Sequence, residues 1–160
     1  MHDMLVRLYA IPSADDALAA CAKRGIAVRR ALAPEKPAVV AWVRAHFASS
    51  TPEVEIAFAQ VPVSCFIALR DNAIVGFACH DVTCRNFFGP EGVAVSERGR
   101  GIGRALLLCA LQAQRAQGYA YAIIGGVGPN AFYEKAVGAI AIPGSTPGIY
   151  GGMLTVRDSD

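Results

Sequence analysis

The sequence predicts a single α/β domain whose sheet contains both antiparallel and parallel strands. Residues 64–70 and 73–81 each have the composition of a strand, and only Asp71-Asn72 separates them, which is turn chemistry that indicates an antiparallel hairpin. Residues 87–126 then read as strand, helix and strand, and two strands joined by a crossover helix run parallel. A length of 160 residues without an internal repeat or a linker favours one domain.

The composition excludes several classes of protein. Hydrophobic residues make up 54% of the chain and charged residues 18%, which is the opposite of a disordered protein. No stretch approaches the ~18 consecutive apolar residues of a membrane-spanning helix, and the start of the chain lacks the apolar segment of a signal peptide. A net charge of +2 is too small to indicate binding to nucleic acid or to an anionic membrane. We therefore expect a cytoplasmic domain that binds neither.

The cysteines are odd in number and scattered, as expected of small apolar residues in a reducing compartment. Cys79-His80 and Cys84 lack a second pair at metal-ligand spacing, which favours a packing role, and no metal is expected. The five positions are Cys21, Cys65, Cys79, Cys84 and Cys109.

The first 60 residues are predicted to form a strand, a helix, a second strand and two further helices. Ser13, followed by Asp15 and Asp16, is suited to cap the first helix, and Gly25 is suited to end it. The predicted elements are, in order, residues 4–11, 14–24, 26–32, 35–48 and 51–60.

After the hairpin, the pattern predicts two more strands, each followed by a helix. The apolar residues of the first of these helices recur at helical spacing, and Gly118 follows its last turn. Prolines and glycines in residues 139–157 predict strands interrupted by loops. The predicted strands are residues 87–96 and 119–126, and the predicted helices are residues 101–117 and 129–137.

The densest chemical signal is a turn with three glycines in five residues, Gly99, Gly101 and Gly103, between a strand and a helix. Glycine has no Cβ, so the backbone amides of such a turn can approach a ligand closely. The first helical turn adds unpaired N–H groups and the positive end of the helix dipole, which together suit a phosphate. Three arginines surround the turn, Arg98, Arg100 and Arg104.

Other interpretations fit parts of this turn. A P-loop needs Lys and then Ser or Thr after the glycines, but Arg104-Ala105 follow Gly103. A dinucleotide-binding turn needs a glycine or alanine where Leu106 stands. A tight strand-to-helix turn with its arginines in solvent needs no ligand, and the glycine pattern alone does not decide between this interpretation and an anion site.

Two segments around the turn resemble motifs of the GCN5-related N-acetyltransferase (GNAT) superfamily. R-G-R-G-I-G at residues 98–103 resembles the family's R/Q-x-x-G-x-G/A element, and A-F-Y-E-K-A-V-G-A at residues 131–139 is similar to its F-Y-x-K-x-G-F segment. The strong resemblance covers residues 64–142, and residues 26–60 fit the family's N-terminal half more loosely. The resemblance implies a mixed, twisted sheet with helices on both faces and central parallel strands that splay apart.

The resemblance also implies an enzyme that transfers acetyl directly from acetyl-CoA to an amine in a ternary complex. The family's fourth strand pairs with the pantetheine arm, which points to Val93 and Val95. Gly126 stands where many members have an asparagine, and Asn130 is a further candidate contact to the cosubstrate. The residues implied to hold the pyrophosphate are Arg98, Gly99, Arg100, Gly101, Gly103 and Arg104.

Tyr133 is the candidate general acid. A departing CoA thiolate has a conjugate pKa near the ~8.5 of cysteine, whereas tyrosine is near ~10, so a tyrosine stays protonated and can donate to the sulfur. The resemblance places Tyr133 at the family's general-acid tyrosine. Ser96 and Cys109 have no neighbouring base in a recognisable arrangement, so no acyl-enzyme is expected.

The sequence offers several candidates for the general base. Glu91 lies two residues before Val93, so it shares a strand face with that residue near the expected acceptor. His80 and Asp81 end the preceding strand and could also face the acceptor, whereas Glu97 is expected to be solvated.

The acceptor is expected to be a small-molecule amine. Residues 35–60, the expected wall of the acceptor cleft, contain Trp42, a partly buried His46, Phe47 and few fixed charges. This composition favours a small or partly apolar amine over a strongly cationic or polyanion-linked one. A domain that binds an acyl-CoA as a sensor and transfers nothing is the alternative function.

Residues 1–25 lie outside the resemblance and are expected to add a strand and a helix to a core of residues 26–157. Strand 4–11, with an apolar face at Leu5 and Tyr9, needs a sheet edge to pair with. That edge belongs either to its own sheet or to a second copy, and the apolar composition favours a homodimer.

Overall fold

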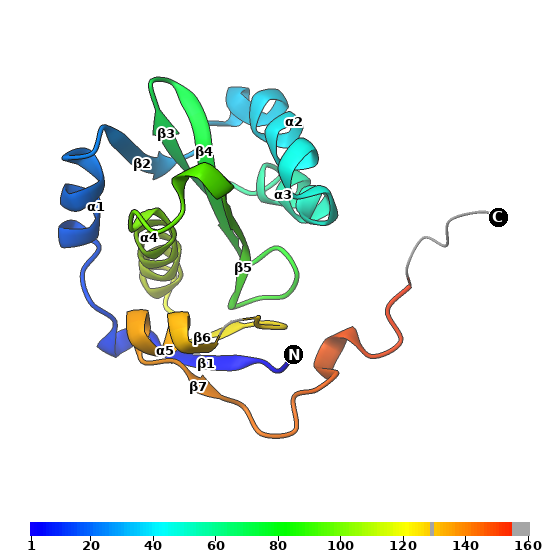
Figure 1. Ribbon diagram of the computed structural model, residues 1–160. Coiled ribbons are helices and arrows are strands. Elements are labelled where there is room, and N and C mark those ends of the chain that lie inside the picture. The colour runs from blue at the N-terminus through cyan, green and yellow to red at the C-terminus, as the bar shows by residue number, and fades with distance from the viewer. Residues whose placement is uncertain (129, 155–160) are drawn as a thin grey trace.

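The computed structural model describes residues 1–128 and 130–154, which form one sheet with helices on both faces (Figure 1). The strand order is β2-β3-β4-β5-β6-β1-β7, and neighbours are antiparallel except β5 and β6, which are parallel. The strands are β1 Met4–Arg7, β2 Ile26–Arg30, β3 Cys65–Arg70, β4 Ala73–His80, β5 Phe87–Val93, β6 Tyr121–Ile124 and β7 Ile140–Ala141. The helices are α1 Asp15–Ala22, α2 Lys36–His46, α3 Thr51–Ala57, α4 Ile102–Ala116 and α5 Asn130–Val137. The sequence-based fold class is therefore confirmed.

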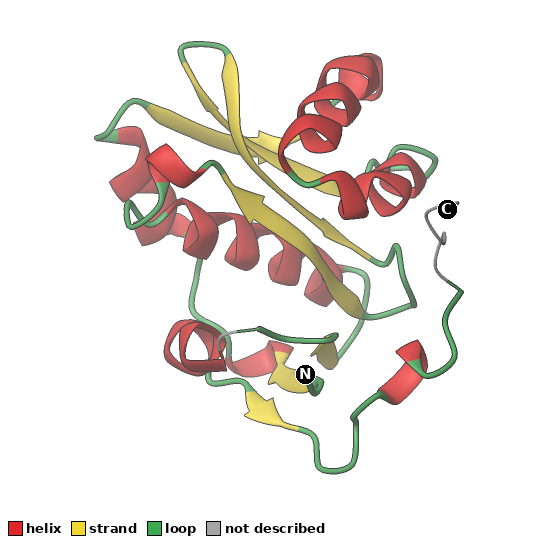
Figure 2. Cartoon of the chain, turned by 45° about the vertical axis from the view of Figure 1, so that its right-hand side comes forward, coloured by secondary structure: helices red, strands yellow, loops and turns green. Residues whose placement is uncertain are grey.

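Two hydrophobic cores lie on opposite faces of the sheet. Helices α1 and α4 cover one face, and α2 and α3 cover the other (Figures 1 and 2). Strand β3 shows why both faces are covered, because its side chains alternate. Cys65 and Ile67 enter the core under α2 and α3, whereas Phe66 and Ala68 enter the core under α4.

The hairpin between β3 and β4 is confirmed. Asp71 and Asn72 have φ values of 49° and 60°, the left-handed conformation that a two-residue type I′ turn requires. The register places Arg70 opposite Ala73, directly across this turn.

The parallel strands β5 and β6 separate soon after they meet. They pair only at Phe87 with Ile123 and at Phe88 with Ile124, so the remainder of β5 has no strand on its β6 side. Strand β5 also ends at Val93, not at residue 96 as predicted, because the backbone turns into a 3-10 helix at Val95–Glu97. This gap between two strands determines the position of the candidate site.

The N-terminal strand lies inside the sheet, between β6 and β7. Met4 and Val6 are fully buried, whereas Tyr9 is 56% exposed, so the predicted apolar face of Leu5 and Tyr9 is wrong. The strand is also shorter than predicted, because Leu8–Ala10 form a 3-10 turn. Strand β1 pairs with β6 along its whole length and with β7 at Met4 and Leu5, so it finds within its own sheet the partners that a second copy was expected to supply, and the homodimer stays a prediction.

Helix α1 begins after Ala14 and not after the predicted cap, although the Ser13 hydroxyl accepts a hydrogen bond from the amide of Asp15 at 3.2 Å. The predicted strands of residues 139–157 reduce, in the part described, to β7 and a 3-10 turn at Gly148–Tyr150; residues 155–157 lie outside the described residues. None of the described helices has the length and apolar composition needed to span a membrane.

Candidate active site

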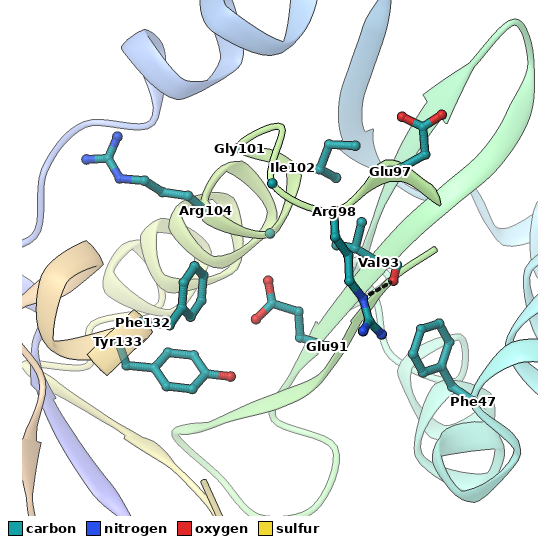
Figure 3. A pocket seen from close by; sticks show the side chains of 13 residues that line it. Phe47, Glu91, Val93, Glu97, Arg98, Gly101, Ile102, Arg104, Phe132 and Tyr133 are labelled. Carbon is teal, nitrogen blue, oxygen red and sulfur yellow. Dashed lines mark hydrogen bonds between the residues drawn. The ribbon is translucent and has the colours of Figure 1, made fainter. Parts of the chain in front are cut away.

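A pocket of about 500 Å³ opens where β5 leaves β6 (Figure 3). The last residues of β5, the glycine turn, the first turn of α4 and helix α5 form its wall, and Phe47 closes it at the end of α2. The lining residues are Phe47, Glu91, Gly92, Val93, Glu97, Arg98, Gly99, Gly101, Ile102, Gly103, Arg104, Phe132 and Tyr133.

The glycine turn offers its backbone to the pocket. Gly99 and Gly101 have φ values of +75° and +83°, a conformation that glycine adopts without strain, and no other heavy atom lies within 4 Å of the place a Cβ would occupy at either. Helix α4 begins immediately afterwards at Ile102, so its first N–H groups have no intrahelical partner. With Arg98 and Arg104 on the lining, these groups fit an anionic ligand such as a pyrophosphate.

One carboxylate beside this turn is already neutralised. Glu97 was expected to be solvated, but its side chain is only 13% exposed and accepts two hydrogen bonds from Arg70, at 3.0 and 2.9 Å. Arg70, with a further contribution from Arg100 at 3.4 Å, holds the pKa of Glu97 below its usual value. Because Arg70 balances the negative charge of Glu97, this carboxylate repels an anion at the turn less strongly.

Glu91 and Tyr133 face each other across the pocket (Figure 3). Burial of the carboxylate raises the pKa of Glu91 to about 8, although the approach of the Tyr133 hydroxyl lowers it in part. Among the described residues no hydrogen bond joins the two groups, and Oε1 of Glu91 is buried without a partner. Burial, followed by the negative charge of Glu91, raises the pKa of Tyr133 well above its usual value, so the phenol stays protonated.

The side chains of this pair are held from several directions. The ring of Tyr133 packs edge-on against Phe88 and Phe132, with centroids 6.4 and 4.9 Å apart. On the Glu91 side, a Cβ at Gly103 would stand 3.3 Å from Oε1, so the missing side chain of Gly103 leaves room for the carboxylate. Gly103, the third glycine of the turn, therefore leaves space for the carboxylate as well as lining the proposed anion site.

The structure brings most of the predicted site residues together but leaves three outside the pocket lining. Val95 is 78% exposed in the 3-10 turn. Arg100 points to Glu97, and its carbonyl accepts a hydrogen bond from Arg24 at 3.0 Å. The Asn130 amide lies 2.9 Å from Nε2 of His2. The predicted residues that do line the pocket are Glu91, Val93, Arg98, Gly99, Gly101, Gly103, Arg104 and Tyr133.

The other candidate bases do not line the pocket. His80 is fully buried, and its Nδ1 lies 2.6 Å from Oδ2 of Asp81, whose Oδ1 accepts a hydrogen bond from the amide of Asn86. Its neighbour Cys79 is buried and Cys84 is exposed; within residues 1–128 and 130–154 no cluster of three or more metal-binding side chains is formed. His46, expected to be partly buried, is exposed and stacks on Trp42 with ring centroids 4.5 Å apart.

Sequence reasoning missed Lys135 as a site residue. A neighbouring cavity of about 450 Å³ is lined by Gly99, Gly101, Arg104, Phe132, Lys135 and Ala136. Lys135 follows Phe132 by three residues, a spacing that places both on one face of α5. The position of Lys135 three residues after Phe132 was the signal available in the sequence. Its positive charge extends the basic region beyond the glycine turn.

Comparisons with known proteins identify the class of this domain. Residues 62–136 match the family model described as an acetyltransferase (GNAT) domain. The GCN5-related glucosamine N-acetyltransferase region of a fungal multi-domain GH3 β-N-acetylglucosaminidase has a TM-score of 0.73 and 17% identity, over 88% of this chain and 19% of that chain. A GCN5-related N-acetyltransferase from Sphaerobacter thermophilus has a TM-score of 0.62 and 19% identity, over 88% of this chain and 48% of that chain. No curated protein matches the chain in sequence.

The structure therefore has the GNAT fold. More narrowly, residues 62–136, which contain β5, the glycine turn, α4 and most of α5, are the part of the chain that matches the GNAT acetyltransferase model. This chain spans less than half the length of either solved structure.

Proposed function

We propose that this domain transfers acetyl from acetyl-CoA to the amine of a small molecule, with both substrates bound at once. The observation that carries the proposal is the opposed pair of Glu91 and Tyr133 in the gap between β5 and β6, beside the glycine turn. A carboxyl and a phenol in one pocket can each move one proton, which acyl transfer to an ammonium requires.

The chain has groups suited to each part of the cosubstrate, which supplies the acetyl as a reactive thioester. The amides at the start of α4, with Arg98 and Arg104, suit its pyrophosphate. Beyond Phe88 the backbone of β5 has no strand on its β6 side, so an amide-bearing arm can hydrogen-bond to that edge. Glu91, whose Oε1 is buried without a hydrogen-bond partner, belongs to this unpaired part of β5.

Tyr133 acts in this proposal as the general acid. Burial and the adjacent carboxylate keep its hydroxyl protonated at neutral pH, so it can donate a hydrogen bond or a proton to a departing sulfur. The aromatic contacts with Phe88 and Phe132 fix the ring, which fixes the position of that proton.

Glu91 acts as the general base. The incoming amine is an ammonium at neutral pH, with a pKa near ~10, and it must lose a proton before it attacks. A carboxylate whose pKa has been raised to about 8 is a stronger base than a solvated glutamate, so it can accept that proton directly or through a water molecule.

Release of free CoA thiol from acetyl-CoA, measured across a pooled panel of amines, tests the proposal. We expect amine-dependent release by the intact chain and a large loss in Tyr133→Phe. Binding of acetyl-CoA without release for any amine would instead favour the acyl-CoA sensor.

A further inference from the structure

A second cavity, of about 350 Å³, opens from the same gap between β5 and β6. Phe88, Gly89 and Pro90 of β5 line it, and the next three residues of that strand line the candidate active site. The centres of the two sets are three residues apart, which is about 10 Å along a strand. Gly125 and Gly126, directly after β6, form the opposite wall.

The second cavity contains one charged side chain, that of Glu53. Glu53 lies on α3, and the hydroxyl of Thr83 donates a hydrogen bond to its Oε1. No salt bridge joins Glu53 to the amino group of Met1, which also lines the cavity, or to another cation among the described residues. Glu55, two residues on, differs in this respect because it pairs with Arg44 at 3.6 Å.

The remaining wall is mostly apolar, and Tyr150 covers part of it. A Cβ at Gly125 would stand 2.5 Å from the Tyr150 hydroxyl oxygen, so only glycine accommodates the ring at that distance. Burial raises the pKa of Tyr150, and the negative charges of Glu53 and Asp3 raise it further. The hydroxyl therefore remains protonated within a negative local field, which favours a cation over an anion in this cavity.

We propose that the second cavity binds the body of the acceptor, and that the acceptor is a primary amine whose apolar body carries a second positive charge, which Glu53 binds. The inference rests on the proposed function, in which the reacting amine lies beside Glu91 and Tyr133. It also revises the expectation of an acceptor with little charge, because the mostly apolar second cavity contains one carboxylate, that of Glu53, to bind a distal ammonium or guanidinium.

A comparison of kcat/KM between matched diamines and monoamines tests this inference. We would measure kcat/KM for a series of α,ω-diamines and for the monoamines of equal length, with wild type, Glu53→Gln and Glu55→Gln. Glutamine keeps the shape of the side chain and an acceptor for Thr83 but removes the charge. We expect wild type to prefer a diamine, and the diamine-to-monoamine ratio of kcat/KM to fall by about 10- to 100-fold in Glu53→Gln, the loss of one charged hydrogen bond. Glu55→Gln, on the same helix but outside the cavity, should keep the wild-type ratio.

Calorimetry with the diamines alone, without acetyl-CoA, separates this inference from the proposed function. Binding that depends on Glu53, in a protein that transfers no acetyl, would support the cavity assignment and overturn the proposed function. Acetyl transfer with an unchanged diamine-to-monoamine ratio in Glu53→Gln would overturn the cavity assignment, as would failure of every diamine to bind wild type. Thermal melts of both variants establish that each is folded.

Discussion

At the scale of single residues, the proposed catalysis depends on the hydroxyl of Tyr133 and the carboxyl of Glu91, both of which are buried. Tyr133→Phe keeps the ring, and therefore the edge-on contacts with Phe88 and Phe132, but removes the proposed proton donor. General acid catalysis is typically worth about 10²–10⁴-fold, so turnover should fall by about that factor. Steady-state kinetics and calorimetry together check this, because acetyl-CoA affinity should change little. An equal loss in both would assign Tyr133 a positioning role.

The ionisation of Glu91 should control the pH dependence of the reaction. With a pKa raised to about 8, the carboxyl is largely protonated at neutral pH, so the rate should rise as the pH increases through about 8 and the base form appears. Glu91→Gln should lower kcat/KM and remove this inflection. A wild-type profile that rises only where the amine itself loses its proton would exclude Glu91 as the base.

The same group should make stability depend on pH. The unfolded chain releases the Glu91 proton near pH 4.5, whereas the folded protein retains it to about pH 8. Glu91 therefore contributes stability below pH 4.5, and this contribution is lost as the pH rises to about 8. Urea unfolding at several pH values should show a smaller decrease across this window in Glu91→Gln than in wild type. Identical slopes in the two proteins would place the carboxyl in contact with solvent.

Substitution of Gly103 by alanine should lower the rate of the reaction without lowering the stability of the fold. Alanine is favoured over glycine within a helix by ~0.8–1 kcal/mol, so Gly103→Ala should melt at the same temperature as wild type or higher. Its methyl group would, however, lie 3.3 Å from Oε1 of Glu91 and displace the carboxylate. Because small displacements of reacting groups can cost up to about 10²-fold, we expect a rate loss of about tenfold or more. A fully active Gly103→Ala would show that the carboxylate position is not critical.

At the scale of elements, the turn before α4 should bind the cosubstrate through particular arginines. Arg104 lines the pocket, whereas Arg100 points to Glu97. Arg104→Gln should therefore weaken acetyl-CoA binding more than Arg100→Gln, although both remove one positive charge. Calorimetry at several salt concentrations checks this, since the contribution of an exposed charge falls as salt rises. Equal effects of the two substitutions would mean that the turn acts only through its net charge.

A side chain at Gly101 should abolish most of this binding. Gly101 is left-handed, with open space where a Cβ would lie, so Gly101→Asp places a negative charge in the proposed pyrophosphate site. Calorimetry should show much weaker acetyl-CoA binding. Equal affinities of wild type and variant would contradict the cofactor assignment.

The glycine turn and the start of α4 could be predicted from sequence because the patterns that indicate them span only a few residues. Glycine spacing, the helical period after it and the second motif at residues 131–139 all describe short stretches of chain. Val95 shows the limit of such signals: alternation continues through V-A-V, but the amide of Ala94 bonds to Val75 and the backbone then turns. Asn130 shows another, because its partner His2 lies 128 residues away. Side-chain placement that depends on distant partners cannot be read from spacing.

At the scale of the whole molecule, the position of β1 was the feature least accessible from sequence. Its composition predicted a strand, but its partners β6 and β7 are more than a hundred residues away, and no local pattern names them. The apolar face was also misassigned, since the alternation of Met4, Val6 and Leu8 with Leu5, Arg7 and Tyr9 fits either choice until the partners are known.

Removal of this strand should therefore unfold the domain. A chain beginning at Gly25 lacks Met4, Val6 and Leu8, all fully buried, and leaves β7 without a neighbour and β6 paired only with β5. Loss of one large buried side chain typically costs about 2–5 kcal/mol, so the loss of three should exceed the stability of a typical domain. Circular dichroism of the truncated chain checks this. A cooperative melt near that of the intact chain would show that β1 is dispensable.

The location of β1 also constrains the order in which the sheet can form. Met4 pairs with Ile124, so 120 residues separate two partners that must meet before the sheet is complete. Contacts this distant in sequence form slowly, because the entropy cost of closing a long loop must be met before the contact can stabilise the chain. Strands β3, β4 and β5 are linked by short connections and can assemble earlier, whereas β6 has an unpaired edge until β1 joins it. Such an edge accepts a strand from any chain nearby, so refolding from denaturant should give less soluble protein as the protein concentration rises.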